Sequence, residues 1–385
     1  MLYVALRMLW GDKIKYLSLI GGVAFASLLI AQQASILSGL TYQTGATIRN
    51  TTGAFDLWVM DPEVEFSEES KPMPDTTPDR VRSVEGVEWA VPMYRGRRQA
   101  RLPDGTLKTV ALVGIDDATL LGGPPTMAEG TLASLREDKA VLLDAAELEK
   151  NFSIQEPGGA RRPMRLGDSF SINDQAVTVT GTFRKEKSFF WEPVIYTTYT
   201  RALTIAPRER KLLTFVLVKA KAGQDLDALA ARIRETTGQK ALRREDFLSL
   251  TGTYVLFKTG ILINFAISVG LGFVIGVLVS AQTFYNFILD NLRHFGVLKA
   301  IGVSNRMLVV MVAAQVLLVG GIGYGVGIGL ASLMGDFFLK GGLAFKMIWE
   351  IPVFTAATIL TVSLIAGALS LARVLRLEPA VVFRS

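Results

Sequence analysis

Long apolar stretches alternate with charged stretches along the chain. Aspartate, glutamate, lysine and arginine are absent from four intervals, which lie between Lys15 and Arg49, Lys258 and Asp290, Arg306 and Asp336, and Glu350 and Arg373. Each interval is longer than the roughly 20 residues with which a helix crosses about 30 Å of hydrocarbon. The pattern predicts four transmembrane helices, at residues 17–39, 259–289, 307–335 and 352–372.

Between the first two helices, residues 40–258 have the pattern of a mixed α/β domain. Short runs of β-branched and aromatic residues, bounded by turn formers, predict strands. The predicted strands are residues 54–60, 87–94, 109–115, 169–172, 176–183, 193–199 and 213–220. Helices are predicted at 138–152 and at 225–238, the second opened by Asp225 and closed by Gly238. The Pro- and acid-rich stretch 61–79 has no hydrophobic period and is predicted to be a mobile loop.

Basic residues set the expected orientation. Lysine and arginine gather before the first helix, in residues 290–306 and in residues 373–385, whereas the short loop 336–351 has only Lys340 and Lys346. The positive-inside rule places both termini and residues 290–306 in the cytoplasm and residues 40–258 outside it. Residues 1–16 read as a cytoplasmic amphipathic interfacial helix, with a plain hydrophilic start to the first span as the alternative. The apolar run of the first span is too long for a signal peptide, which favours an uncleaved anchor.

Composition agrees with this layout. Of 385 residues, 50% are hydrophobic and 20% charged, and the mean hydropathy is +0.36. These values are too apolar for a soluble protein and too charged for one wholly embedded in lipid. The expected fold is four transmembrane helices plus a large extracytoplasmic mixed α/β domain. Because the net charge of +6 lies largely beside the spans, it does not indicate nucleic-acid binding.

Several kinds of chemistry are excluded by count. There is no phosphate-binding G-x-x-x-x-G-K-[ST] loop, no cysteine, and one histidine, His294. The predicted spans contain amides but no central ionisable residue, whereas ion-driven carriers usually hold their coupling ion on such groups. The chain is therefore expected to be no enzyme, to bind no cofactor or metal itself, and to receive energy from another subunit.

Residues 291–308, "NLRHFGVLKAIGVSNRML", form a short basic segment between two predicted spans. Four apolar side chains, of Phe295, Val297, Leu298 and Ile301, are expected as knobs for a partner's groove. The basic side chains of Arg293, Lys299 and Arg306 would hold the segment at the water boundary. Gly296 and Gly302 would allow close approach or stop a helix. An interfacial connector without a partner is the alternative.

Three further patterns have two readings each. Gly321, Gly325 and Gly329 recur every fourth residue, with Gly323 and Gly327 in a second row, and such rows let helices pack closely within one subunit or between two. The aromatic side chains of Phe189, Phe190 and Trp191 are a candidate contact for a partner or substrate, or the buried start of a strand. A basic strand is expected either to meet anionic lipid or glycolipid or to be a solvated edge. Its members are Arg95, Arg97, Arg98 and Arg101.

Two segments resemble signatures of the FtsX/MacB superfamily of ABC-transporter permeases, and most closely its DevC branch. "FGVLKAIGVSNRML" is similar to the pattern E-[YI]-G-x-L-[KR]-A-[LI]-G-x-[ST], and "ARVLRLEPAVVFR" is similar to the closing signature A-x-x-x-[RK]-x-[DE]-P-x-x-x-[LF]-R. The order of spans agrees over nearly the whole chain. MacB itself carries a fused ATPase, and this chain does not.

The resemblance implies a coupling helix at residues 290–306 that rests on a separate ABC ATPase, which binds ATP and Mg. The coupling residues that it assigns are Arg293, His294, Phe295, Gly296, Leu298, Lys299, Ala300 and Gly302. His294 stands where the family usually has glutamate. The implied assembly is a permease homodimer in the bacterial cytoplasmic (inner) membrane, with two ATPase subunits, a periplasmic membrane fusion protein and an outer-membrane duct.

The resemblance also implies a function. We expect an efflux permease that exports a lipid-like or amphipathic substrate by motion of the external domain. A non-transporting, FtsX-like mechanotransmitter that activates an external hydrolase is the alternative, as is a lipoprotein-release permease.

Overall fold

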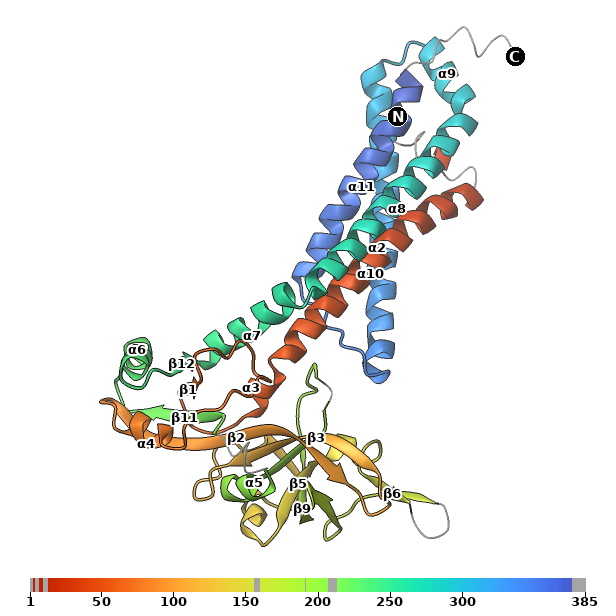
Figure 1. The fold of residues 1–385 in the computed structure, drawn as a ribbon. Coiled ribbons are helices and arrows are strands. Elements are labelled where there is room, and N and C mark those ends of the chain that lie inside the picture. The colour runs from red at the N-terminus through yellow and green to blue at the C-terminus, as the bar shows by residue number, and fades with distance from the viewer. Residues whose placement is uncertain are drawn as a thin grey trace. The chain divides into compact units, whose positions relative to one another are not determined.

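A computed structural model describes residues 3, 7–9, 13–155, 160–190, 192–206 and 213–375. The chain divides into two compact units, drawn in Figure 1. The helical unit comprises residues 1–41 and 260–385, and the α/β unit comprises residues 42–259. The sequence-based domain boundaries were 40 and 258.

The helical unit contains four long apolar helices. They are α2 (Lys13–Thr44), α8 (Ile261–Asp290), α10 (Asn305–Lys340) and α11 (Glu350–Leu375), with the short α9 (Leu292–Ala300) between α8 and α10. By length and composition, all four long helices can cross a membrane. The predicted fold class is confirmed. The predicted interfacial helix at 1–16 lies mostly outside the described residues, and its residues 13–16 belong to α2.

One apolar core holds the helical unit together. It joins Val23 and Ile30 of α2, Phe284 of α8 and Val316 of α10, and it continues through Ile359 of α11. The buried hydroxyls of Ser27 and Ser370 donate to backbone carbonyls, to Tyr324 O at 3.2 Å and to Ala366 O at 2.9 Å. Such bonds satisfy polar groups where water is excluded.

The α/β unit is built on a ten-stranded sheet in the order β12-β1-β11-β2-β3-β10-β5-β9-β4, with β8 beside β2 and β9. β10 runs parallel to β3 and β5 runs parallel to β9, whereas the other pairs are antiparallel. The strands are β1 (Leu57–Met60), β2 (Val87–Arg101), β3 (Leu107–Ile115), β4 (Thr126–Glu129), β5 (Ala140–Asp144), β8 (Ser169–Ile172), β9 (Gln175–Arg184), β10 (Val194–Thr198), β11 (Phe215–Ala220) and β12 (Lys240–Arg243), with a separate pair β6 (Ser153–Gln155) and β7 (Arg161–Pro163). The helices are α3 (Ala46–Asn50), α4 (Thr77–Arg82), α5 (Tyr199–Ile205), α6 (Leu226–Thr237) and α7 (Arg244–Lys258), with 3₁₀ turns η1 (Leu132–Arg136) and η2 (Ala145–Glu147).

The long strand β2 connects the two halves of this sheet. Its first half pairs with β11 and its second half pairs with β3 and β8. Separate apolar clusters lie along it: one contains Val216 and Leu229, and another contains Leu112 and Phe170. The middle of β2, from Tyr94 to Arg98, therefore lies where the two halves of the α/β unit meet (Figure 1).

The structure corrects two local predictions in this unit and adds one helix. The helix predicted at 138–152 is wrong, because Ala140–Asp144 form β5, which pairs with β9 and β10 and is buried throughout. A strand covered on both faces shows no alternation in its sequence. The helix α7 was not predicted. The stretch 61–79 follows an ordered path instead of forming a free loop, and Met73 bridges to Leu213.

Candidate functional site

Gly302 stops the short helix α9, which is one of the two roles predicted for it. Its φ of 94° lies in the left-handed region, and its amide donates to Lys299 O at 3.0 Å. The Val303 amide donates to Leu298 O, also at 3.0 Å. This pair of bonds is a Schellman motif, which satisfies the last carbonyls of a helix. Leu298 and Val303 both pack on the core of the helical unit, so the cap fixes how α9 leaves that core.

The inner face of α9 anchors it to the helical unit. Phe295 is fully buried and belongs to the same core cluster as Leu9, Phe284 and Leu308, and Gly296 is buried beside it. Leu298 is partly buried against this cluster. The expectation that Phe295 is an apolar knob for a partner was therefore wrong, because its ring is used inside the chain.

The outer face of α9 is open. Val297 is 40% exposed and Ile301 is 75% exposed, and Arg293, His294 and Ala300 are also exposed. Their spacing of three and four residues places these side chains on one side of the helix. Lys299 is half-buried. Two apolar side chains beside a basic edge are what a helix needs to dock in a partner's groove. Coupling to an ATPase through these residues stays a prediction.

The two glycine rows of α10 have different surroundings. Side chains at Gly323 and Gly327 would collide with Val23 and Ser27 of α2, so this row lets α10 and α2 pack closely. Gly321, Gly325 and Gly329 have no described atom within 4 Å of the position that a Cβ would take. Packing of Gly321, Gly325 and Gly329 within the subunit is therefore contradicted, and Gly323 and Gly327 make the close contact with α2 instead. Packing of Gly321, Gly325 and Gly329 between subunits stays a prediction.

A row of small residues on α8 was missed in the sequence. Gly272, Gly276 and Ser280 are buried, and a Cβ at Gly276 would lie 2.7 Å from the Cβ of Ala26 on α2. The four-residue spacing was the available signal. In contrast to these residues, most of α8 is exposed in the single chain. Of the residues in its apolar 18-residue segment, 11% are buried, compared with 39% to 44% in the corresponding segments of the other three helices.

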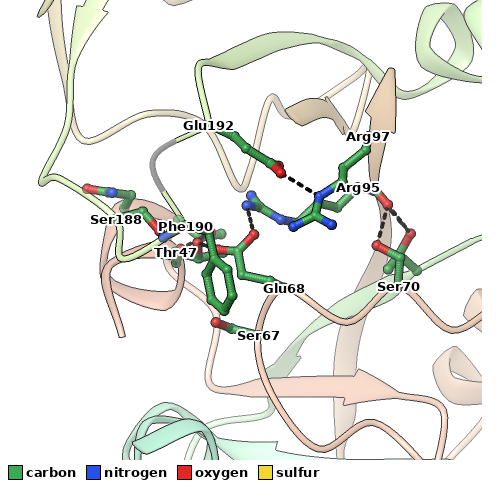
Figure 2. A network of polar contacts seen from close by, with 12 residues as sticks. Thr47, Ser67, Glu68, Ser70, Arg95, Arg97, Ser188, Phe190 and Glu192 are labelled. Carbon is green, nitrogen blue, oxygen red and sulfur yellow. Dashed lines mark hydrogen bonds and ion pairs between the residues drawn. The ribbon is translucent and has the colours of Figure 1, made fainter. Parts of the chain in front are cut away.

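In the α/β unit, polar contacts hold the two segments at its chain ends, α3 and α7, to its loops. The carboxylate of Glu68 accepts hydrogen bonds from Thr47 of α3 and from Arg95 of β2 (Figure 2). Glu68 and Arg95 are both buried, with side chains 5% and 8% exposed. The neighbouring Ser67 amide donates to Thr251 Oγ1 of α7 at 3.1 Å. One loop therefore contacts both α3 and α7.

A second loop holds α3 from another side. Glu186 forms an ion pair with Arg49, with 2.7 Å between Oε2 and Nε. Its backbone makes two reciprocal bonds of 2.9 Å with the amide side chain of Asn50. The loop begins at Lys185, which pairs at 3.3 Å with the buried Asp144. Burial raises the pKa of Asp144, and the ammonium of Lys185 opposes that shift.

The predicted aromatic contact lies beside these loops. Phe190 stacks on Phe66 with 5.7 Å between ring centroids, and Phe66 stacks on Tyr254 of α7 at 4.6 Å. Phe189 meets Phe190 edge-to-face. Trp191 lies outside the described residues. Phe189 and Phe190 are half-buried in a turn before β10, so the alternative of a buried strand start is wrong, and a contact with a partner or substrate stays a prediction.

Within the described residues, no set of three or more histidine, aspartate and glutamate side chains is placed to hold a metal ion. Hydrogen bonds, ion pairs and apolar packing hold α3 and α7 to the loops that carry Glu68 and Glu186, and these segments lie far apart in the sequence.

Four apolar helices long enough to cross a membrane, a short helix with one open face between two of them and a large α/β unit inserted after the first are the features of a multi-pass membrane protein. Comparison with known families matches residues 17–236 to the MacB-like periplasmic core domain and residues 261–379 to the FtsX-like permease C-terminal region. The chain belongs to this family of ABC-transporter permeases. No curated protein matches the sequence.

Solved structures with limited similarity include two extracytoplasmic domains. The extracellular domain of the noncanonic ABC-type transporter YknZ from Gram-positive bacteria is 16% identical, with a TM-score of 0.34, over 49% of this chain and 99% of that chain. The periplasmic region of MacB from Actinobacillus actinomycetemcomitans is 12% identical, with a TM-score of 0.37, over 52% of this chain and 94% of that chain.

Proposed function

We propose that the chain is the membrane-spanning subunit of an ABC-type efflux system of the DevC branch. It works as a homodimer in the bacterial inner membrane, with both termini in the cytoplasm. A separate ATPase docks on the outer face of α9, and its motion passes to the α/β unit, which expels a lipid-like or amphipathic substrate toward a membrane fusion protein and an outer-membrane duct. The match of residues 17–236 to the MacB-like periplasmic core domain carries this proposal.

Two features of the chain support the need for an external ATPase. Its sequence has no phosphate-binding loop, and its predicted spans have no central ionisable residue with which to couple an ion gradient. The exposed Val297 and Ile301, beside Arg293 and His294, offer an apolar and basic surface for a partner. A docking surface on a helix joined directly to α8 and α10 favours transmission of a push to both.

The contacts of α3 and α7 support transmission to the α/β unit. α3 follows the first membrane helix in the sequence and α7 precedes the second, and both are tied to the loops that carry Glu68 and Glu186. Bonds to Thr47, Arg49, Asn50 and Thr251 would pass a displacement of either helix into the sheet.

The test is capture of the tagged protein from its native membrane in a mild detergent, with mass spectrometry of the proteins recovered. We expect an ABC ATPase and a membrane fusion protein. The Ile301→Asp variant should lose the ATPase, because a carboxylate replaces an exposed apolar contact on the outer face of α9. Recovery of a cell-wall hydrolase instead of a fusion protein would support mechanotransmission, a second permease paralogue would support lipoprotein release, and no ATPase with the unaltered protein would refute the proposal.

A further inference from the structure

A cavity of about 430 Å³ opens at the middle of β2. The strand contributes residues from Tyr94 to Arg98, the loop before it contributes Glu68, Ser70, Lys71 and Pro72, and Thr214 completes the lining. Its volume lies in the range of roughly 300–1,000 Å³ that is typical of small-molecule sites.

The lining is strongly basic. Lys71, Arg95, Arg97 and Arg98 carry positive charge, and Glu68 is the single carboxylate among the lining residues. Glu68 is already paired with Arg95, and both side chains are buried (Figure 2). The carboxylate therefore cannot neutralise the other three cations.

Two of these cations have carboxylate partners outside the cavity. Arg97 Nε lies 2.6 Å from Glu192 Oε1, and Lys71 Nζ lies 3.0 Å from Glu63 Oε2 and 3.5 Å from Glu69 Oε1. Arg97 and Glu63 are the well-exposed members of these pairs, so water screens the Arg97–Glu192 and Lys71–Glu63 pairs and another anion can replace their carboxylates. Hydrogen bonding to Glu63 raises the pKa of Lys71, which keeps its ammonium charged.

Arg98 has no such partner. Its guanidinium donates to the hydroxyl of Tyr94 and, at 2.6 Å, to Arg97 O, and neither acceptor carries charge. Its Nε–H is buried without an acceptor among the described residues. The positive charge of Arg98 is thus not neutralised by any carboxylate in the described part of the chain.

Gly96 makes the room in which this guanidinium lies. A Cβ at position 96 would lie 2.6 Å from the Tyr94 hydroxyl and 3.4 Å from Arg98 Nη2. A glycine at this place lets Tyr94 and Arg98 meet, so that Tyr94 orients the guanidinium at the cavity wall.

We propose that this cavity binds the phosphate group of a ligand, with Arg98 as the principal contact and Lys71 and Arg97 beside it. A guanidinium can hold a phosphate through two parallel N–H···O bonds, and Arg98 is the lining cation whose charge no described carboxylate neutralises. The proposal does not depend on the proposed efflux function. Because Glu68, which lines the cavity, also accepts from Thr47 of α3, bound phosphate lies next to a contact with that helix.

The test uses the full chain in dodecyl maltoside, which contains no phosphate, and isothermal titration with inorganic phosphate and with dihexanoyl phosphatidic acid. The variants are Arg98→Ala, Arg98→Lys and Lys71→Ala. Arg101→Ala is the matched control, since Arg101 is an exposed arginine of the same strand outside the cavity.

We expect Arg98→Ala to weaken binding at least tenfold, Lys71→Ala to weaken it severalfold and Arg98→Lys to restore part of the loss, because lysine keeps the charge without the paired donors. Arg101→Ala should bind like the unaltered protein. Equal affinity for both probes would identify free phosphate or a phosphate ester as the source, and binding of the lipid alone would identify a lipid headgroup.

Two results would overturn the proposal. One is the absence of saturable binding of either probe to the unaltered protein. The other is binding that Arg98→Lys and Lys71→Ala leave unchanged, and this result decides the matter even where Arg98→Ala does not fold.

Discussion

Two glycines of α10 allow a direct test of how the helical unit is packed. A Cβ at Gly327 would lie 2.5 Å from Ser27 Cβ and 2.6 Å from Ala24 O, both on α2. A Cβ at Gly325 has no described atom within 4 Å. Gly327→Ala should therefore force α10 and α2 apart, whereas Gly325→Ala adds the same methyl group without a collision inside the chain.

The size of the effect follows from these distances. Non-bonded carbon atoms rest about 3.5–4.0 Å apart, so the two helices must separate by about 1 Å around Gly327. Overpacking of this kind costs about 1–3 kcal/mol. Alanine is favoured over glycine in a helix by about 1 kcal/mol, which offsets part of this cost. We expect Gly327→Ala to lose up to about 2 kcal/mol and Gly325→Ala to lose nothing or gain up to about 1 kcal/mol.

The assay is unfolding of the purified protein in dodecyl maltoside by added sodium dodecyl sulfate, followed by helical circular dichroism. A lower midpoint for Gly327→Ala than for Gly325→Ala is expected. Equal midpoints, or a Gly325→Ala variant less stable than Gly327→Ala, would refute the close packing of α10 on α2. Gly325→Leu in the same detergent reports separately on the exposed row: a smaller oligomer by light scattering means that this row packs between copies.

Three shorter predictions concern α9 and the α/β unit. Ile301→Asp should abolish co-purification of the ATPase at unchanged stability. Leu298→Asp should also lower the melting temperature, because Leu298 packs on the helical core. If both variants still co-purify with the ATPase, the assignment of the outer face is refuted. Gly302→Val should destabilise the protein by about 1–2 kcal/mol in thermal melting, since valine resists the left-handed conformation, and an unchanged melting curve would contradict the cap. Asp168→Asn should destabilise the protein at pH 7, because hydrogen bonds from Arg162 hold the pKa of Asp168 below its ordinary value of about 3.9. That stabilisation is present above about pH 3.9 and is lost as the pH falls through the lower folded pKa, so the difference between Asp168→Asn and the unaltered protein should shrink in acid melts; a difference that grows in acid would refute it.

The sequence was sufficient for the membrane helices and for locally coded elements. Burying an isolated charge in hydrocarbon is so unfavourable that the charge-free intervals alone reveal the four long helices. The helix α6 was also predictable from its ends. Asp225 Oδ1 accepts from the Asp227 amide at 3.0 Å, and Gly238 closes the helix at a φ of 74°. These signals depend on a few neighbouring residues, so no tertiary contact is needed to read them.

Elements whose form depends on distant partners were not predictable. The run Ala140–Asp144 becomes a strand because β9 and β10 flank it, and those strands come much later in the sequence. The loop with Glu68 is ordered by Arg95 and Thr251, which lie 27 and 184 residues away from their partners in that loop. Which glycine row of α10 meets α2 also depends on helix rotation, which spacing alone leaves open.

The site on α9 also has one feature that the sequence could predict and one that depends on tertiary packing. Its composition indicated an amphipathic helix, but four apolar residues at similar spacing gave no sign of which ones face inward. The structure separates them: Phe295 is fully buried, Leu298 is half-buried, and Val297 and Ile301 remain exposed. Burial of Phe295 fixes the rotation of α9, and that rotation leaves the basic edge at Arg293 and His294 on the outer face. The anchoring residue and the docking residues therefore have distinct tasks, and a substitution at Phe295 should affect stability before it affects any partner.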